Sequence, residues 1–283
     1  MSVIHQKFLD LSETSKARPL IMGVLNATPD SFFDGGLYLD PMRALAHAHI
    51  MLAEGADLLD LGGESTRPGA TPVGEAEELR RILPIAELLN RELPDAPWSI
   101  DTSKAAVAKA ALELGACMIN DVSALSADPA MPAVAAGSGC GVVLMHRASA
   151  ATSQISGYGE AGVCAAVAKF LLKRIGELET AGLKKGQFWV DPGFGFGKSV
   201  EDNLSLIKGL PALVSLGYPV LLGTSRKSSL GAVLGGLPEN ERLEGTAATV
   251  ALAAFAGVAC LRVHDPKEMS RVVRVVQAVK DAR

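Results

Sequence analysis

The feature that most restricts the fold of this sequence is a repeated alternation of short apolar runs with longer amphipathic stretches rich in Ala and Leu. Such alternation is typical of βα units arranged around a parallel sheet. Eight strands are expected, at residues 21–25, 58–61, 98–100, 118–119, 141–145, 188–190, 219–222 and 259–263. Their helices are expected to begin near Pro41, Glu75, Lys104, Pro129, Glu160, Glu201, Ser225 (continuing from Leu243) and Pro266. Eight such units predict an α/β fold, a single (β/α)8 TIM barrel.

The length and composition agree with one barrel domain. The chain has 283 residues, of which 48% are hydrophobic and 29 are glycine, and this is enough to bury a large core. No linker, low-complexity tract or shift in composition divides the sequence. We therefore expect an N-terminal extension over residues 1–17, followed by a single barrel domain over residues 18–283.

The charge and the cysteines narrow the class of partner. With 27 basic and 31 acidic residues, the net charge of -4 provides no basic field for nucleic acid, so an anionic ligand needs local Arg and Lys side chains. The four cysteines form no CxxC pair and are expected to be structural thiols, not metal or redox groups. The N-terminal segment lacks an apolar signal region, and no stretch approaches a membrane span. These features predict a soluble, cytoplasmic protein that acts on small molecules.

Chemically reactive residues follow every expected strand. Catalytic groups of a (β/α)8 barrel gather on the loops at the carboxyl ends of its strands, so these residues are expected to share one face. They are NATPDS (26–31), GGESTRPGA (62–70), DTSK (101–104), ND (120–121), HR (146–147), DPGFGFGK (191–198), GTSRKS (223–228) and Arg262 with His264. A single polar loop is an ordinary connection, but eight of them at one end of a barrel indicate a functional site.

Four of these residues suit a deep pocket for a flat heterocycle. Asp101, Asn120, Asp191 and Lys227 each stand next to the end of an apolar strand, where carboxylates and amides can read the donors and acceptors at the edge of a ring. The competing interpretation of an Asp at such a position is that it caps the next helix. We favour capping for Asp121 and ring recognition for Asp101.

A second group suits an anion. Arg262 and His264 are two apart on an extended segment and so face the same side, where with Asn26, Thr66 and Arg67 they can enclose a phosphate or pyrophosphate. The run at 225–228 is expected to open a helix whose N–H groups and cations favour a carboxylate or phosphate. The glycine-rich run 191–198 lacks the GxxxxGK[ST] frame, and its Phe196 is better interpreted as a wall against a ring. His47 and His49 are expected to be structural.

These motifs together resemble the dihydropteroate synthase family. The matching segments are NATPDSFFDGG (26–36), DLGGESTRPGA (60–70), SIDTSK (99–104), NDVSAL (120–125), VLMH (143–146), DPGFGFGK (191–198), GTSRKS (223–228) and RVHD (262–265). The resemblance runs in order over about residues 18 to 280. It implies a pterin-binding barrel over residues 18–283 that joins 6-hydroxymethyl-7,8-dihydropterin pyrophosphate to p-aminobenzoate with Mg2+, releasing pyrophosphate and 7,8-dihydropteroate. It also implies a cytoplasmic homodimer and a target of sulfonamides.

The resemblance also implies roles for individual residues. Asn26 corresponds to the metal residue and, with Asp101, Asp191 and Lys227, to the catalytic set. Residues implied to contact the pterin pyrophosphate are Thr66, Asp101, Asn120, Asp191, Lys227, Arg262 and His264. Residues implied to border the p-aminobenzoate site are Arg67, Phe196 and Ser228, with Ser228 at a helix start receiving the carboxylate. The GESTRPGA loop is then expected to bridge the two substrates.

Two departures from the family pattern stand out. Ala27 and Phe33 replace the usual Val and Ser of the first motif, and the stretch HRASAATS (146–153) differs from the usual sequence of the fifth loop. Two alternatives remain open: a methyltetrahydrofolate:corrinoid methyltransferase and a non-catalytic pterin-binding paralogue. The first gives no reason for an anion cluster at Thr66, Arg67, Arg262 and His264. Intact Asn26 and Lys227 argue against the second.

Overall fold

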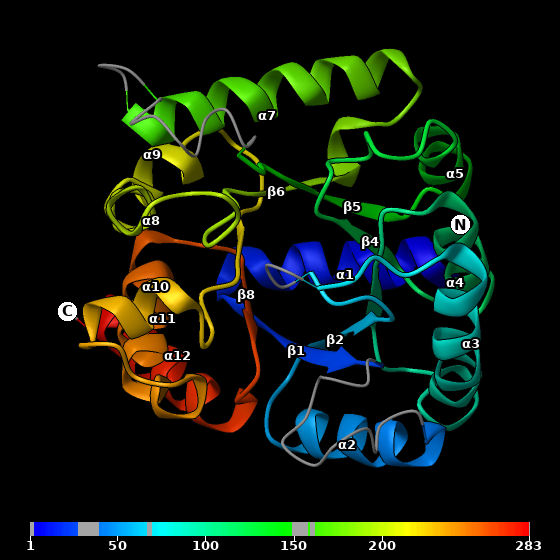
Figure 1. Cartoon of the computed structure of the whole chain (residues 1–283), viewed down its shortest axis with the longest axis horizontal. Coiled ribbons are helices and arrows are strands. Elements are labelled where there is room, and N and C mark those ends of the chain that lie inside the picture. Colours follow the sequence, from blue (N-terminus) through cyan, green and yellow to red (C-terminus); the bar gives the residue numbers. More distant parts are fainter. Residues whose placement is uncertain (1–2, 28–39, 67–69, 149–157, 159–161, 283) are drawn as a thin grey trace.

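The computed structural model describes residues 3–27, 40–66, 70–148, 158 and 162–282. Parallel strands form a ring, and helices surround it (Figure 1). Hydrogen-bonded neighbours run in the order β6-β5-β4-β3-β2-β1-β8-β7, and a bridge between Val190 and Val220 joins the two ends of this sheet. The strands are β1 (Leu20–Asn26), β2 (Leu58–Gly62), β3 (Trp98–Asp101), β4 (Met118–Asp121), β5 (Gly141–Met145), β6 (Phe188–Asp191), β7 (Leu221–Leu222) and β8 (Cys260–Val263). The predicted α/β fold with a single (β/α)8 barrel is confirmed.

The helices begin close to the expected positions, with one clear exception. α10 begins at Ser228 and not at Ser225, because Arg226 adopts a left-handed φ of 58° and the N–H of Lys227 closes a turn onto Thr224. The start expected near Glu160 lies outside the described residues. The helices after the strands are α2 (Pro41–Ala53), α3 (Glu75–Glu92), α4 (Ala105–Glu113), α5 (Met131–Ser138), α7 (Gly162–Thr180), α8 (Val200–Lys208), α9 (Leu210–Val214), α10 (Ser228–Val233), α11 (Leu243–Ala256) and α12 (Pro266–Asp281).

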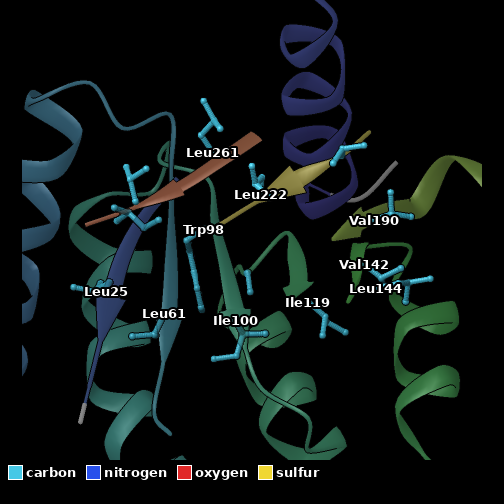
Figure 2. Close-up of a cluster of buried hydrophobic side chains, with 14 of the residues drawn as sticks. Leu25, Leu61, Trp98, Ile100, Ile119, Val142, Leu144, Val190, Leu222 and Leu261 are labelled. Carbon is cyan, nitrogen blue, oxygen red and sulfur yellow. The ribbon is translucent and has the colours of Figure 1, made fainter. Parts of the chain in front are cut away.

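Side chains alternate between two layers along each strand, because successive strand residues point to opposite faces. One set points outward and forms the main core under the helices; it includes Leu25, Leu61, Ile100, Ile119, Val190 and Leu261 (Figure 2). The other set points inward and fills the barrel with Met22, Leu58, Met118, Val143, Trp189 and Cys260. Two residues further along the strands, the inward positions carry Asp60, Asp101, Asn120, Asp191 and Arg262. The barrel is therefore apolar at its amino end and polar at its carboxyl end.

Helix α1 (Val3–Ala17) lies within the predicted N-terminal extension; it covers the amino end of this apolar interior and crosses the ring in Figure 1. Phe8 is fully buried, and its ring centroid lies 6.3 Å from that of Trp189. Gly141 makes room for it, since a Cβ at that position would stand 2.2 Å from Phe8 Cε2. Among the described residues, no helix has the length and apolar character needed to cross a membrane.

Candidate active site

A cavity of about 460 Å3 opens at the carboxyl ends of the strands. Its volume is within the range of small-molecule sites. Each of the eight strands, or the loop that follows it, supplies part of the lining. The lining includes Asn26, Thr66, Asp101, Asn120, Met145, Asp191, Phe196, Lys227, Ser228, Arg262 and His264. The sequence-predicted site residues within the described ranges therefore share one cavity.

Three lining residues, Asp101, Asn120 and Arg262, belong to a hydrogen-bonded cluster centred on Asp60, a fully buried residue that does not itself line the cavity. Its Oδ2 accepts a bond from Arg262 Nε at 2.6 Å and one from Asn120 Nδ2 at 3.0 Å. Its Oδ1 accepts the Ser99 hydroxyl at 2.5 Å. Arg262 also donates from Nη2 to Asp101 Oδ2 at 3.1 Å. One guanidinium is thus shared by two carboxylates, and its single positive charge offsets only part of their combined negative charge.

The pKa of Asp101 responds to this shared pairing. The pKa of Asp101 is raised from its ordinary value near 3.8 to about 7. Burial is the main cause, and the negative charge of Asp60 adds to it; the positive charge of Arg262 lowers the pKa by less than Asp60 raises it. The carboxyl group of Asp101 therefore changes charge close to neutral pH. A perturbed carboxyl group in a cavity is characteristic of functional sites.

Asp191 and Lys227 form the second charged part of the floor. Asp191 Oδ1 accepts the N–H of Gly193 at 2.6 Å, and burial raises the pKa of Asp191 although Lys227 opposes the shift. Burial lowers the pKa of Lys227 to about 8, with the charge of Asp191 acting in the other direction. The Lys227 ammonium donates to the carbonyl of Phe194 and stands 4.5 Å from the centre of the Phe196 ring. A cation and an aromatic wall are thus held side by side.

The glycine-rich run after β6 is folded around a lysine, which explains its glycines. Lys198 Nζ donates to the carbonyl oxygens of Gly193 at 2.8 Å and His146 at 3.0 Å, which joins the fifth and sixth loops. Gly195 has a left-handed φ of 82°, and a Cβ there would lie 2.8 Å from Lys227 Cδ. The run therefore shapes the wall around Lys227 and Phe196.

His264 and Asn26 also line the cavity. His264 Nδ1 lies 2.9 Å from Ser225 Oγ, and the backbone N–H of His264 donates to the same oxygen at 3.2 Å. These two contacts hold the imidazole in one orientation. Asn26 is the last residue of β1 and pairs in register with Gly62, close to the second loop where Thr66 lines the cavity.

Two sequence interpretations concerning aspartates are resolved by hydrogen bonds. The prediction that Asp121 caps the next helix is wrong: its carboxylate accepts the N–H groups of Ser123 and Leu125 in a turn, and α5 begins only at Met131. Asp101 does not cap α4 either, since the N–H of Ala105 at the start of α4 bonds to Asp128. The carboxylate of Asp101 accepts a hydrogen bond from Arg262 instead.

Several expectations fall on residues outside the described ranges. Arg67 is one of them, as are the first-loop residues 28–39 and the atypical segment 149–153.

Sequence reasoning did not single out Asp60. The signal was present, because Asp60 is a charged residue inside an apolar strand, two positions after the inward-facing Leu58. Lys104 was named as a helix start and within the run DTSK but was given no role of its own; it pairs at 2.5 Å with Glu64, which lines the cavity, and at 2.5 Å with buried Glu78.

Thiol chemistry has no place in this cavity, because none of the four cysteines lines it. Burial raises the pKa of Cys117 to about 12 and that of Cys140 to about 11, which keeps both thiols protonated and unreactive. The described residues also contain no group of three or more His, Cys, Asp or Glu side chains that is arranged to hold a metal ion. The carboxylates, amide and cations of the cluster provide hydrogen-bond acceptors and donors for a polar ligand.

Comparison with known proteins agrees with this chemistry. The profile of the family described as "Pterin binding enzyme" matches residues 22–264. The dihydropteroate synthase of Bacillus subtilis is 43% identical over 277 residues, covering 98% of this chain and 93% of that protein. The Xanthomonas albilineans dihydropteroate synthase with 4-aminobenzoic acid superposes with a TM-score of 0.87 at 45% identity, covering 94% of each chain. The Yersinia pestis dihydropteroate synthase with a sulfonamide drug gives a TM-score of 0.88 at 41% identity over 96% of each chain.

The barrel and the polar floor of its cavity define an enzyme of the pterin-binding class. Within that class the identities extend over nearly the whole length of this chain and its relatives. The chain belongs to the dihydropteroate synthase family and is a transferase.

Proposed function

We propose that this chain condenses 6-hydroxymethyl-7,8-dihydropterin pyrophosphate with p-aminobenzoate. Different residues of the cavity are assigned to the pterin ring, to the pyrophosphate leaving group and to p-aminobenzoate. The observation that carries the proposal is the convergence of Asp101, Asn120, Asp191 and Lys227 on one cavity floor. Carboxylates accept from the N–H groups of a pterin, while Asn120 and Lys227 supply the complementary amide and ammonium. Thr66, Arg262 and His264 lie on the same cavity and are assigned to the pterin pyrophosphate.

The reaction needs a stabilised leaving group and a stabilised cation. His264 and Arg262 carry N–H donors with which to bind the pyrophosphate as its C–O bond breaks. The methylene carbon left behind is positive and conjugated with the pterin ring. Asp101 and Asp191 stabilise that charge when they are ionised, because they lie in a buried, preorganised site. The amine of p-aminobenzoate then attacks this carbon, and the mechanism needs no enzyme nucleophile.

The donor chemistry of the site fits Mg2+. Asn26 offers an amide oxygen, and Mg2+ commonly binds through one or two protein oxygens together with substrate phosphates. When bound, Mg2+ would neutralise part of the charge on the departing pyrophosphate.

The p-aminobenzoate site is assigned to Arg67, Phe196 and Ser228. Phe196 provides a flat wall, and Ser228 stands at the first residue of α10 on the same cavity. Because this site adjoins the pyrophosphate residues, p-aminobenzoate is expected to bind weakly to the free enzyme and more tightly with pyrophosphate present. Calorimetric titration with and without pyrophosphate measures the difference, and equal affinities would count against this assignment.

The catalytic proposal as a whole is tested with purified protein, the pterin pyrophosphate, labelled p-aminobenzoate and Mg2+. Formation of labelled dihydropteroate with release of pyrophosphate is the expected result. Methyl transfer from methyltetrahydrofolate, or pterin binding without turnover, would point to the two alternatives considered from the sequence.

The proposal extends to the organisation of the protein. Residues 18–283 are assigned to the pterin-binding domain, and residues 1–17 to an extension that closes the amino end of the barrel. The cytoplasm is the proposed location, supported by four cysteines that form no disulfide.

A homodimer is also proposed, and exposed apolar side chains on neighbouring helices support it. Leu252 and Phe255 of α11 and Val275 and Val279 of α12 are between 57% and 65% exposed. An apolar surface of this kind favours association with a second subunit. Light scattering should report a dimer for the natural protein and a monomer for Phe255→Asp. A monomeric natural protein would contradict the assignment.

A further inference from the structure

The carboxylate of Asp60 holds together two side chains that face the cavity. A single oxygen, Oδ2, accepts both Arg262 Nε at 2.6 Å and Asn120 Nδ2 at 3.0 Å. The residue is fully buried and does not line the cavity, so it does not meet a ligand directly. Its side-chain hydrogen bonds to lining residues are those to Asn120 and Arg262, and its charge also acts on Asp101.

The bond to Asn120 decides which end of that amide faces the ligand. A carboxylate that is paired with a guanidinium can only accept hydrogen bonds, so the NH2 end of Asn120 must turn towards Asp60. The carbonyl end, Oδ1, is then directed away from Asp60, and Asn120 lines the cavity. The orientation of the amide is thereby fixed: its carbonyl oxygen can accept from a ligand, and one of its two N–H donors is already used by Asp60.

The bonds to Arg262 fix its guanidinium in the same way. Nε donates to Asp60 and Nη2 donates to Asp101, so two nitrogens of the planar group are held and its plane is set. These bonds use two of the five N–H donors that an arginine carries. The donors of Nη1 keep a fixed direction relative to the carboxylate of Asp101.

We propose that Asp60 is a positioning residue for pterin recognition: its Oδ2 atom fixes the orientation of the Asn120 amide and the plane of Arg262. This inference rests on the proposed function, since it takes a pterin as the ligand of the cavity. Ser99 provides a matched comparison. Its hydroxyl also bonds Asp60, but at Oδ1 and from a position that does not line the cavity.

The test compares Asp60→Ala, Asp60→Asn and Ser99→Ala by titration with a pterin that lacks phosphates. Asp60→Ala removes the shared acceptor and should weaken pterin binding at least about tenfold, the effect of losing roughly one charge-assisted hydrogen bond. Asp60→Asn can keep an oxygen at the Oδ2 position while its amide NH2 faces the Ser99 hydroxyl, so it should recover most of that loss. Ser99→Ala should stay within about threefold of the natural protein. The affinity for p-aminobenzoate in the presence of pyrophosphate should change little in all three.

A double-mutant cycle separates positioning from a general loss of stability. In an Asn120→Ala background, Asp60→Ala should cost clearly less pterin affinity than it does in the natural chain, because one of the groups it positions is gone. Equal costs in both backgrounds, or a similar loss for Asp60→Ala and Asp60→Asn, would overturn the inference. If circular dichroism shows that Asp60→Ala is unfolded, Asp60→Ser takes its place with the same expectations.

Failure of the proposed function would look different. A natural protein that binds no pterin would remove both the function and the positioning role. A natural protein that binds pterin, together with an Asp60→Ala variant that binds equally well, would remove the positioning role alone.

Discussion

Asp101 and Arg262 meet on the floor of the cavity, where Asp101 Oδ2 lies 3.1 Å from Arg262 Nη2. The same guanidinium is bound more closely by Asp60, at 2.6 Å from its Nε. Asp101 therefore receives only part of one positive charge while it loses its hydration by burial. That imbalance is why the pKa of Asp101 is raised to about 7 in spite of an ion pair.

The rate of reaction should depend on pH with a narrow maximum. Below about pH 7 Asp101 is protonated and cannot stabilise a cation, so kcat/KM for the pterin substrate should rise as pH rises towards that value. Above about pH 8 Lys227 loses its charge, so kcat/KM should fall again. Steady-state rates across this range measure the profile. Asp101→Asn should flatten the acidic side, and Lys227→Arg the alkaline side, because a guanidinium stays protonated.

Removing the charge of Asp101 should slow the chemical step more than it weakens binding. Asp101→Asn keeps the shape of the side chain but cannot stabilise a positive methylene. Interactions that are stronger in the transition state act on the rate and not on substrate affinity. We expect turnover to fall by roughly 10²-fold or more, with a much smaller change in affinity. Single-turnover kinetics with a direct titration decide this: near-normal turnover would refute the electrostatic role, and a loss of affinity alone would leave Asp101 as a ring-binding residue.

Adding one methyl group at Gly195 should disturb Lys227. The Cβ of Gly195→Ala would lie 2.8 Å from Lys227 Cδ, on a backbone whose φ of 82° disfavours any residue with a Cβ. We expect a loss of pterin affinity of about tenfold or more, with a destabilisation of roughly 1 kcal/mol. Titration and thermal unfolding measure the two effects. Gly186→Ala is the control, since no atom lies within 4 Å of the added Cβ; equal behaviour of the two variants would contradict the prediction.

Truncating His264 should affect the phosphorylated substrate selectively. The imidazole is held by Ser225 at the side of the cavity assigned to the pyrophosphate. His264→Ala should therefore impair turnover of the pterin pyrophosphate far more than it weakens binding of a pterin that lacks phosphates. Parallel kinetics and titrations test this difference. Comparable losses for both ligands would indicate a folding defect instead.

The N-terminal helix should matter for stability and not for chemistry. Phe8 is fully buried at the amino end of the barrel, away from the cavity at the carboxyl ends of the strands. Phe8→Ala should lower the free energy of unfolding by about 3–5 kcal/mol, the usual cost of emptying such a site. Urea unfolding gives this value, and kcat/KM of the folded variant should stay close to normal. Val3→Ala, at a 73% exposed position of the same helix, should be nearly neutral.

Much of the site was accessible from short-range patterns. The alternation of apolar runs and amphipathic stretches predicted the barrel, and the end of each strand marked where its polar residues would gather. Asn120 and Asp191 were found in this way, because strand ends of a parallel barrel share one face. Local pattern was less reliable for exact boundaries. The start of α10 depended on the left-handed backbone of Arg226, which a non-glycine residue adopts only when its surroundings fix it.

By itself, then, the sequence determined which residues are apolar, which lie at strand ends and which family the motifs resemble. Those properties depend on neighbours within a few positions. They appear in the sequence as a repeat of two residues in strands and of 3.6 residues in helices. Only the tertiary structure decided the partners of the buried charges. Arg262 meets Asp60, which is 202 residues away in sequence, because closure of the ring brings β8 to β1 and β2. The pKa of Asp101 and the orientation of Asn120 both follow from that closure, since the energy of a buried charge is set by whatever surrounds it in space and not along the chain.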